Sequence, residues 1–192
     1  MQIEIRADGA HISGYVNVTE KKSRPVITPH GKVIEEIEPR AFEKALERTD
    51  NVQLWKDHNP NVVLAETRAG NLELYEDNIG LHYDAVITDE QTVAEARAGK
   101  IKGMSFGMKN VVDTVEQRAD ALPLRKISDL DIDHITLVVK KVPIYSATSV
   151  EVRAGTDVDI ETRAFEDKLK IIEHKDPPDL SEYRNRINAL KA

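Results

Sequence analysis

The stretch GKIKGMSFGMKNVV, from Gly99 to Val112, contains the pattern G-x-S-x-G around Ser105. In one class of hydrolases this pattern forms a sharp turn between a strand and a helix, and its serine is the nucleophile. The residues that follow Ser105 here, MKNVVDTVEQ, are rich in β-branched valine, which favours a continuing strand over a helix. We therefore expect Ser105 to lie within a strand.

Side chains of a strand point alternately to its two faces. On one face we expect three core residues, Met104, Phe106 and Met108. Ser105 belongs to the other face, where Gly103 and Gly107 flank it. Two glycines leave the hydroxyl uncovered and let another backbone approach closely. Such an opening suits a peptide substrate. A serine with only a structural role, on a strand that crosses a neighbouring segment closely, would also be flanked by two glycines.

A serine hydroxyl needs a base within hydrogen-bond reach and a third group that orients the base. His58 ends the apolar segment NVQLWKDH, just before a predicted turn at 59–61 (Asn-Pro-Asn). His134, in LDIDHITLV, shares a strand face with apolar residues, which suits either a core histidine or a site. Less weight goes to the histidines of polar segments or of a solvated face, His11, His30, His82 and His174. No H-E-x-x-H or comparable spacing favours a zinc site.

The composition narrows the functional classes further. The 192 residues carry a formal charge of −7, so no basic excess is present to neutralise nucleic-acid phosphates. Cysteine is absent, which excludes disulfides and thiolate metal sites and is compatible with a reducing cytoplasm. The first residues, MQIEIRADGA, lack the apolar segment of a signal peptide, and no run approaches the roughly 18 apolar residues of a membrane span. We expect no nucleic-acid partner and no membrane partner.

The chain divides into two parts by pattern. Short strand signals separated by turns continue to Gly155, with helices predicted at EPRAFEKALER and TDEQTVAEARAGK. Residues 1–155 are therefore predicted to form a mostly β domain with helices, of the α+β class. From Thr156 the chain becomes charge-rich, and one stripe of apolar residues follows helical spacing: Phe165, Leu169 and Ile172. Residues 156–192 are predicted to be an appended helical tail.

Six segments of the sequence, taken in order, form a larger pattern. They are GYVNV (14–18), EEIEPRAFEKAL (35–46), VQLWKDHN (52–59), GLHYDAVI (80–87), TVAEARAGKIKG (92–103) leading into MSFG, and IDHITLVVKKVPIYSATSVEVR (132–153). Together they resemble the prohead (capsid maturation) proteases of tailed bacteriophages, a family similar in fold and catalysis to herpesvirus assemblin. One departure is Arg40, which stands where the family usually has glycine.

The resemblance implies an assemblin-like closed or nearly closed β-barrel flanked by helices. It implies a serine endopeptidase without a cofactor, encoded by a phage or prophage and packaged inside the assembling procapsid in the bacterial cytoplasm. The implied substrates are the scaffolding segment of the major capsid protein and the protease itself, by autocleavage, with a homo-oligomer as one arrangement of the enzyme. The tail at 156–192 becomes a candidate packaging segment that self-cleavage removes.

The resemblance also implies roles at matching positions. Ser105 takes the place of the nucleophile, and His58 that of the general base and then acid. Many members have a glutamate where this sequence has His134, but assemblin uses a Ser-His-His triad, so His134 is the implied orienting residue. Asp131 and Asp133 are alternative third members, although strand alternation points them to the opposite face.

Two other functions are compatible with the residues. A different serine hydrolase, such as an esterase, would need a helix directly after Ser105 and an acid–histidine pair. A non-catalytic capsid-assembly module would keep the fold but would leave Ser105, His58 and His134 far apart. The distances among these three side chains distinguish the hypotheses.

Overall fold

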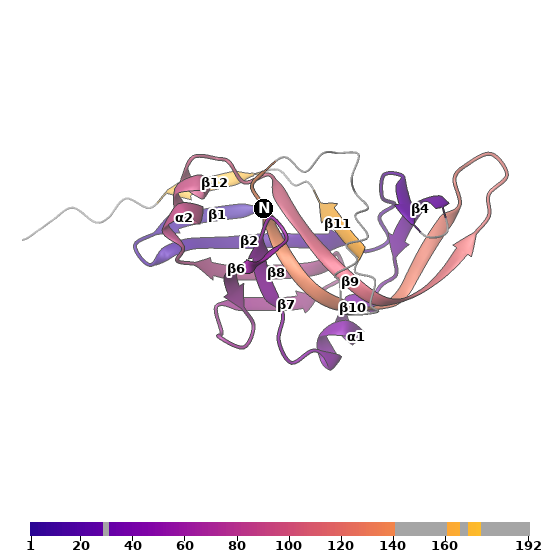
Figure 1. The fold of residues 1–192 in the computed structure, drawn as a ribbon, viewed down its shortest axis with the longest axis horizontal. Helices are drawn as coiled ribbons and strands as arrows, with labels where there is room; N and C mark the ends of the chain where they lie inside the picture. Colours follow the sequence, from indigo (N-terminus) through magenta and orange to yellow (C-terminus); the bar gives the residue numbers. More distant parts are fainter. Residues whose placement is uncertain (29–30, 141–160, 166–168, 174–192) are drawn as a thin grey trace, which may run out of the picture.

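The computed structural model describes residues 1–28, 31–140, 161–165 and 169–173. Over these ranges the chain is mostly β, with two helices and two sheets (Figure 1). The prediction of a mostly β protein with helices is confirmed. The division into domains at residue 155 stays a prediction, because residues 141–160 lie outside the described ranges, as do His30 and His174.

The first sheet contains five strands. They are β1 (Gln2–Arg6), β2 (Gly9–Val18), β7 (Leu72–Glu76), β8 (Gly80–Ile87) and β12 (Lys170–Glu173). Their order across the sheet is β12-β1-β2-β8-β7, and every pair is antiparallel except β1 with β12. Alternate residues of β1 and β2 are buried, as expected for strands with one face on a core.

The second sheet carries the predicted site residues. Its strands are β3 (Val26–Thr28), β4 (Gly31–Ile37), β5 (Gln53–Lys56), β6 (Asn59–Glu66), β9 (Gly103–Glu116), β10 (Leu124–Val138) and β11 (Glu161–Phe165). The main path runs β11-β9-β10-β4-β3, and β5 joins it through β10 and carries β6. β10 pairs in parallel with β4 along its first residues and with β5 along its last ones.

β9 is the strand predicted from the opening stretch. It continues without interruption from Gly103 to Glu116, so no helix follows Ser105 and the esterase-type turn is wrong. The three residues predicted for the core, Met104, Phe106 and Met108, are all buried. Phe106 contacts Phe42 edge to face, with ring centroids 5.5 Å apart, which joins this strand to the helix below it.

The predicted closed or nearly closed barrel is not found among the described residues. The first sheet ends at β12 and β7, and the main path of the second ends at β11 and β3, so no ladder joins the two sheets into a ring. Figure 1 shows why: the long β9–β10 hairpin extends past the end of the first sheet and carries β4 along its far half. A barrel would require those edge strands to pair.

The prediction of a helical tail is wrong for the two tail segments that the structure describes. β11 pairs antiparallel with β9, and β12 pairs in parallel with β1. Short isolated helices are marginal in water, whereas a segment that adds to an open sheet edge gains a ladder of backbone hydrogen bonds. Residues 174–192 lie outside the described ranges.

The two helices are α1 (Ala41–Arg48) and α2 (Glu90–Arg97). Within the part of the chain that the structure describes, neither is long and apolar enough to cross a bilayer. The start of α1 is capped from outside, because the Glu76 carboxylate at the end of β7 accepts the N–H groups of Arg40 and Glu43, each at 2.7 Å. A carboxylate at a helix N-terminus satisfies free donors and complements the helix dipole.

Arg40 is strained at this cap. Its φ of 70° is left-handed, a conformation that glycine adopts freely and that costs other residues roughly 1–2 kcal/mol. We predict that Arg40→Gly is more stable than Arg40→Ala by about 1 kcal/mol, or about 2 to 4 °C in Tm. Both variants lose the same exposed ion pair with Glu43. The difference between their melting temperatures therefore measures the cost of the left-handed backbone alone. Equal melting temperatures would contradict it.

Candidate active site

His58 lies in a two-residue turn between β5 and β6. The ladder pairs Lys56 with Asn59, and the two turn residues, Asp57 and His58, have φ of 48° and 57°. Hairpin turns with two positive φ angles favour Asn-Gly, so this turn holds two side chains in a strained backbone, as often occurs at functional sites. The turn predicted at 59–61 is wrong: Pro60 lies at the start of β6, a position where a strand tolerates proline.

Thr136 of β10 and the two residues that follow this strand fix the turn in place. Asp57 Oδ1 accepts the backbone N–H groups of Val139 and Lys140, at 2.8 and 3.0 Å. The backbone N–H of His58 donates to Thr136 Oγ1 at 3.0 Å, and that hydroxyl donates to the carbonyl of Trp55 at 3.1 Å. These bonds satisfy groups that the strained turn would otherwise leave unpaired.

The structure brings the two predicted histidines together. His58 Nδ1 lies 2.7 Å from His134 Nε2, and His134 Nδ1 lies 2.9 Å from Asp133 Oδ2. The indole of Trp55 stacks on the His134 ring, with centroids 3.9 Å apart and planes 12° from parallel. His134 is 2% exposed. Its ring is therefore buried and is held at both nitrogens and on one face.

The hydrogen bonds determine which nitrogen carries each proton. The Asp133 carboxylate accepts, so His134 Nδ1 must donate; in the neutral ring His134 Nε2 then accepts. His58 Nδ1 is therefore the donor of the bond between the rings, which leaves the lone pair on His58 Nε2. The arrangement makes His58 Nε2 a proton acceptor, which is the requirement for a general base.

Asp133 is the residue whose position the alternation rule misjudged. The β9–β10 register shifts between Ile132 and His134, a local irregularity that lets neighbouring side chains reach one another. The pKa of Asp133 lies below its ordinary value, mainly because of the hydrogen bond from His134, which outweighs burial. Asp131, the other alternative, is bound instead by Arg48 and by Asn110 Nδ2, at 3.0 and 2.8 Å. No sequence signal marked the irregularity.

Burial keeps His58 neutral. Removal of its ring from water, followed by repulsion from His134, lowers its pKa to about 4, and the charge of Asp57 opposes the shift. A histidine with this pKa is uncharged at neutral pH and free to accept a proton, although burial also makes the charged form costly.

Ser105 lies on β9 beside the histidine pair, directly opposite Thr136 of β10 in the ladder. It is 1% exposed, so the expectation of an uncovered hydroxyl is wrong in this structure. Its hydroxyl donates to the backbone carbonyl of Arg163 on β11 at 2.7 Å. Among the described residues no hydrogen bond joins Ser105 to His58. The structure thus brings His58 and His134 into contact and places Ser105 on β9, the strand that pairs with β10.

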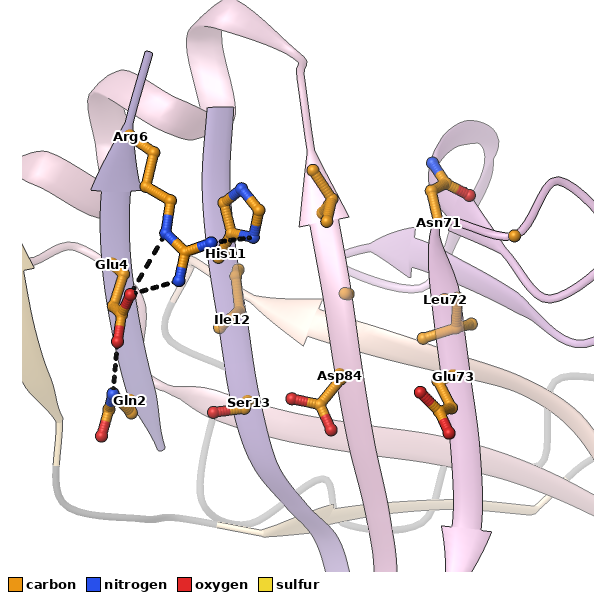
Figure 2. Close-up of a pocket in the computed structure, with 13 residues that line it drawn as sticks. Gln2, Glu4, Arg6, His11, Ile12, Ser13, Asn71, Leu72, Glu73 and Asp84 are labelled. Carbon is orange, nitrogen blue, oxygen red and sulfur yellow. Dashed lines mark hydrogen bonds and ion pairs between the residues drawn. The ribbon is translucent and has the colours of Figure 1, made fainter. Parts of the chain in front are cut away.

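A surface cavity of about 310 Å³ lies elsewhere, on the first sheet, and contains none of these three residues (Figure 2). Strands β1, β2, β7 and β8 line it with polar side chains, and Arg6 there bridges Glu4 and His11. Ser105 and His134, in contrast, are buried. Over the described ranges, no cluster of three or more His, Asp or Glu side chains could hold a metal ion.

The structure thus contains an oriented, neutral histidine in the turn after β5 and a buried serine on β9. A family model described as caudovirus prohead serine protease matches residues 1–162. The chain belongs to this family of phage proteases, and membership implies a serine protease of capsid maturation with a capsid protein as substrate. Neither the curated proteins nor the solved structures that were compared gave a match.

The lowered pKa of His58 predicts an acid-sensitive fold. The unfolded histidine titrates near 6.5 and the folded one near 4, so between these values the unfolded chain binds a proton that the folded chain does not. Above about pH 6.5 neither state binds this proton, and the free energy of unfolding has its full value. As the pH falls from 6.5 toward 4, proton uptake by the unfolded chain lowers the free energy of unfolding. NMR titration of the ring should report a pKa well below 6.5. The His58→Gln variant should lose stability less steeply over that window, and parallel curves would contradict the assignment.

Proposed function

We propose that this chain is the serine endopeptidase that cleaves the scaffolding segment of the major capsid protein, and its own tail, inside the procapsid. Ser105 is the nucleophile, His58 the base, and His134 the residue that orients His58. The observation that carries the proposal is the hydrogen bond between His58 Nδ1 and His134 Nε2, because it directs the free lone pair of His58 outward from the pair.

The reaction follows from these roles. The Ser105 hydroxyl turns from the Arg163 carbonyl to His58 Nε2, gives up its proton and adds to the scissile carbonyl carbon. His58 then protonates the leaving amine as the C–N bond breaks, and water hydrolyses the acyl-enzyme with His58 again as base. His134 holds the His58 ring and accepts its Nδ1 hydrogen bond throughout.

Asp133 extends the triad by one member. A neutral imidazole stabilises an imidazolium less well than a carboxylate does, so a Ser-His-His triad alone should be a modest catalyst. Here the carboxylate of Asp133 lies one ring away from His58 and fixes the tautomer of His134. We assign Asp133 as a positioning residue, which acts on His58 only through His134.

The first test removes the nucleophile. Ser105→Ala loses one hydrogen bond, so the free energy of unfolding should fall by only about 1 kcal/mol. Peptide cleavage should fall by several orders of magnitude, to the residual rate that binding and the oxyanion donors supply. Co-expression with the cognate capsid protein should then yield shells with full-length capsid chains. Processing at the wild-type rate would favour the non-catalytic assembly module.

The second test addresses Asp133. An asparagine can donate as well as accept, so Asp133→Asn weakens the preference for one His134 tautomer, and kcat should fall about 10- to 100-fold with KM unchanged. Asp131→Asn is the matched control, because that neighbouring carboxylate binds Arg48 and Asn110 instead. Steady-state kinetics on one peptide measures both. A fall in kcat that is equal in the two variants would mean that Asp133 serves only the fold.

A further inference from the structure

The tail strand β11 lies where an extended peptide substrate would meet the serine. It runs antiparallel to β9, with Ala164 opposite Ser105 and Arg163 opposite Phe106 (Figure 1). The Arg163 carbonyl oxygen is 2.7 Å from Ser105 Oγ. A peptide that binds by strand addition presents its backbone in this way, and a catalysed bond must lie within reach of the nucleophile. The carbonyl nearest to Ser105 therefore belongs to the Arg163–Ala164 peptide bond.

The side chain of Arg163 enters a site made by the body of the protein. It is 6% exposed, and the Glu35 carboxylate of β4 accepts two bonds from it, one from Nε and one from Nη2 at 2.7 Å. Glu35 is itself 4% exposed. A planar guanidinium paired with a buried carboxylate is a strong and geometrically selective contact, which lysine cannot reproduce.

The charges around Glu35 favour a cation from outside. Arg125 of β10 is the cation already present, and it binds Glu35 and Asp113 as well as Glu161 of β11. With β11 set aside, two carboxylates and one guanidinium remain, so one negative charge is uncompensated. A buried carboxylate without a partner is costly, and an arriving arginine supplies Glu35 with a second guanidinium. β11 also brings Glu161, which pairs with both Arg125 and Arg163, so the arginine serves Glu35 as a direct partner and the net charge of the cluster stays at −1.

We propose that β11 occupies the substrate groove and that Glu35 is the specificity-determining residue, which selects arginine at the residue before the scissile bond. This inference rests on the proposed function and deepens it. The first substrate is then the chain itself. Ser105 Oγ adds to the Arg163 carbonyl carbon as His58 takes its proton, and the bond to Ala164 N breaks as that nitrogen takes the proton back. Water then hydrolyses the ester and leaves a chain that ends at Arg163.

The test in trans uses full-length protein and peptides that are identical except for arginine, lysine, leucine or glutamate before the scissile bond. For each enzyme preparation we compare the ratio of kcat/KM between two peptides. Chains whose groove is filled by their own β11 lower both values by the same factor, so the ratio does not depend on their number. Wild type should prefer the arginine peptide over the leucine peptide, and Glu35→Gln should reduce this preference by about 10- to 100-fold. Glu36→Gln, which removes the neighbouring carboxylate on the opposite face of β4, should leave the preference unchanged.

The test in cis uses mass spectrometry of the purified chain during incubation. Wild type should yield a product that ends at residue 163, Arg163→Leu should form the corresponding product much more slowly, and Ser105→Ala should form none, which excludes a contaminating protease. Labelling of Ser105 by a phosphonylating reagent reports the proposed function separately. Labelled enzyme that cleaves peptides without arginine preference, or with a preference that survives Glu35→Gln, overturns this inference alone. Absence of both labelling and cleavage overturns the proposed function with it.

Discussion

Backbone pairing along β10 determines where every group of the site lies. One edge of β10 pairs with β9, which carries Ser105, and the last residues of its other edge pair with β5, which leads to His58. His134 lies on β10 itself. Because β-sheet hydrogen bonds fix neighbouring strands about 4.8 Å apart, the segments that carry three residues far apart in sequence are brought to adjacent strands by main-chain bonds. Side-chain bonds of Asp57 and Thr136 then fix the turn that carries His58.

A second constraint is the cost of burying charge. The cluster around Arg125 contains three carboxylates from three strands, and the donors of Arg125 and Arg163 together satisfy them. Burial opposes the charge of Arg125, but its bonds to Glu161, Asp113 and Glu35 outweigh that effect, so its pKa lies above the ordinary value. The cluster and the histidine chain at the other end of β10 are both buried polar networks that join β10 to other segments of the chain.

The sequence was informative where local rules govern the structure. Valine-rich residues after Ser105 predicted a strand, and alternation predicted correctly that Met104, Phe106 and Met108 are buried, although Ser105 on the other face is buried too. The same alternation failed at Asp133, because a register shift depends on how β9 and β10 pair, which no local pattern records. The sequence pattern also did not predict that β11 covers Ser105. The apolar spacing of the tail fits a helix, and this segment becomes a strand because it pairs with the open edge of β9.

The parallel pairing of β12 with β1 also affects the order in which the molecule folds. Gln2 pairs with Lys170, so nearly the whole described chain must be made before this ladder can close. Contacts between residues so distant in sequence form slowly, because the entropy of closing the intervening loop must be met first. During synthesis the β9–β10 hairpin and the turn at His58 can form while residues 161–173 are still absent. A newly made chain therefore passes through a stage in which Ser105 lies at an open sheet edge, and its lifetime is set by the rate of translation.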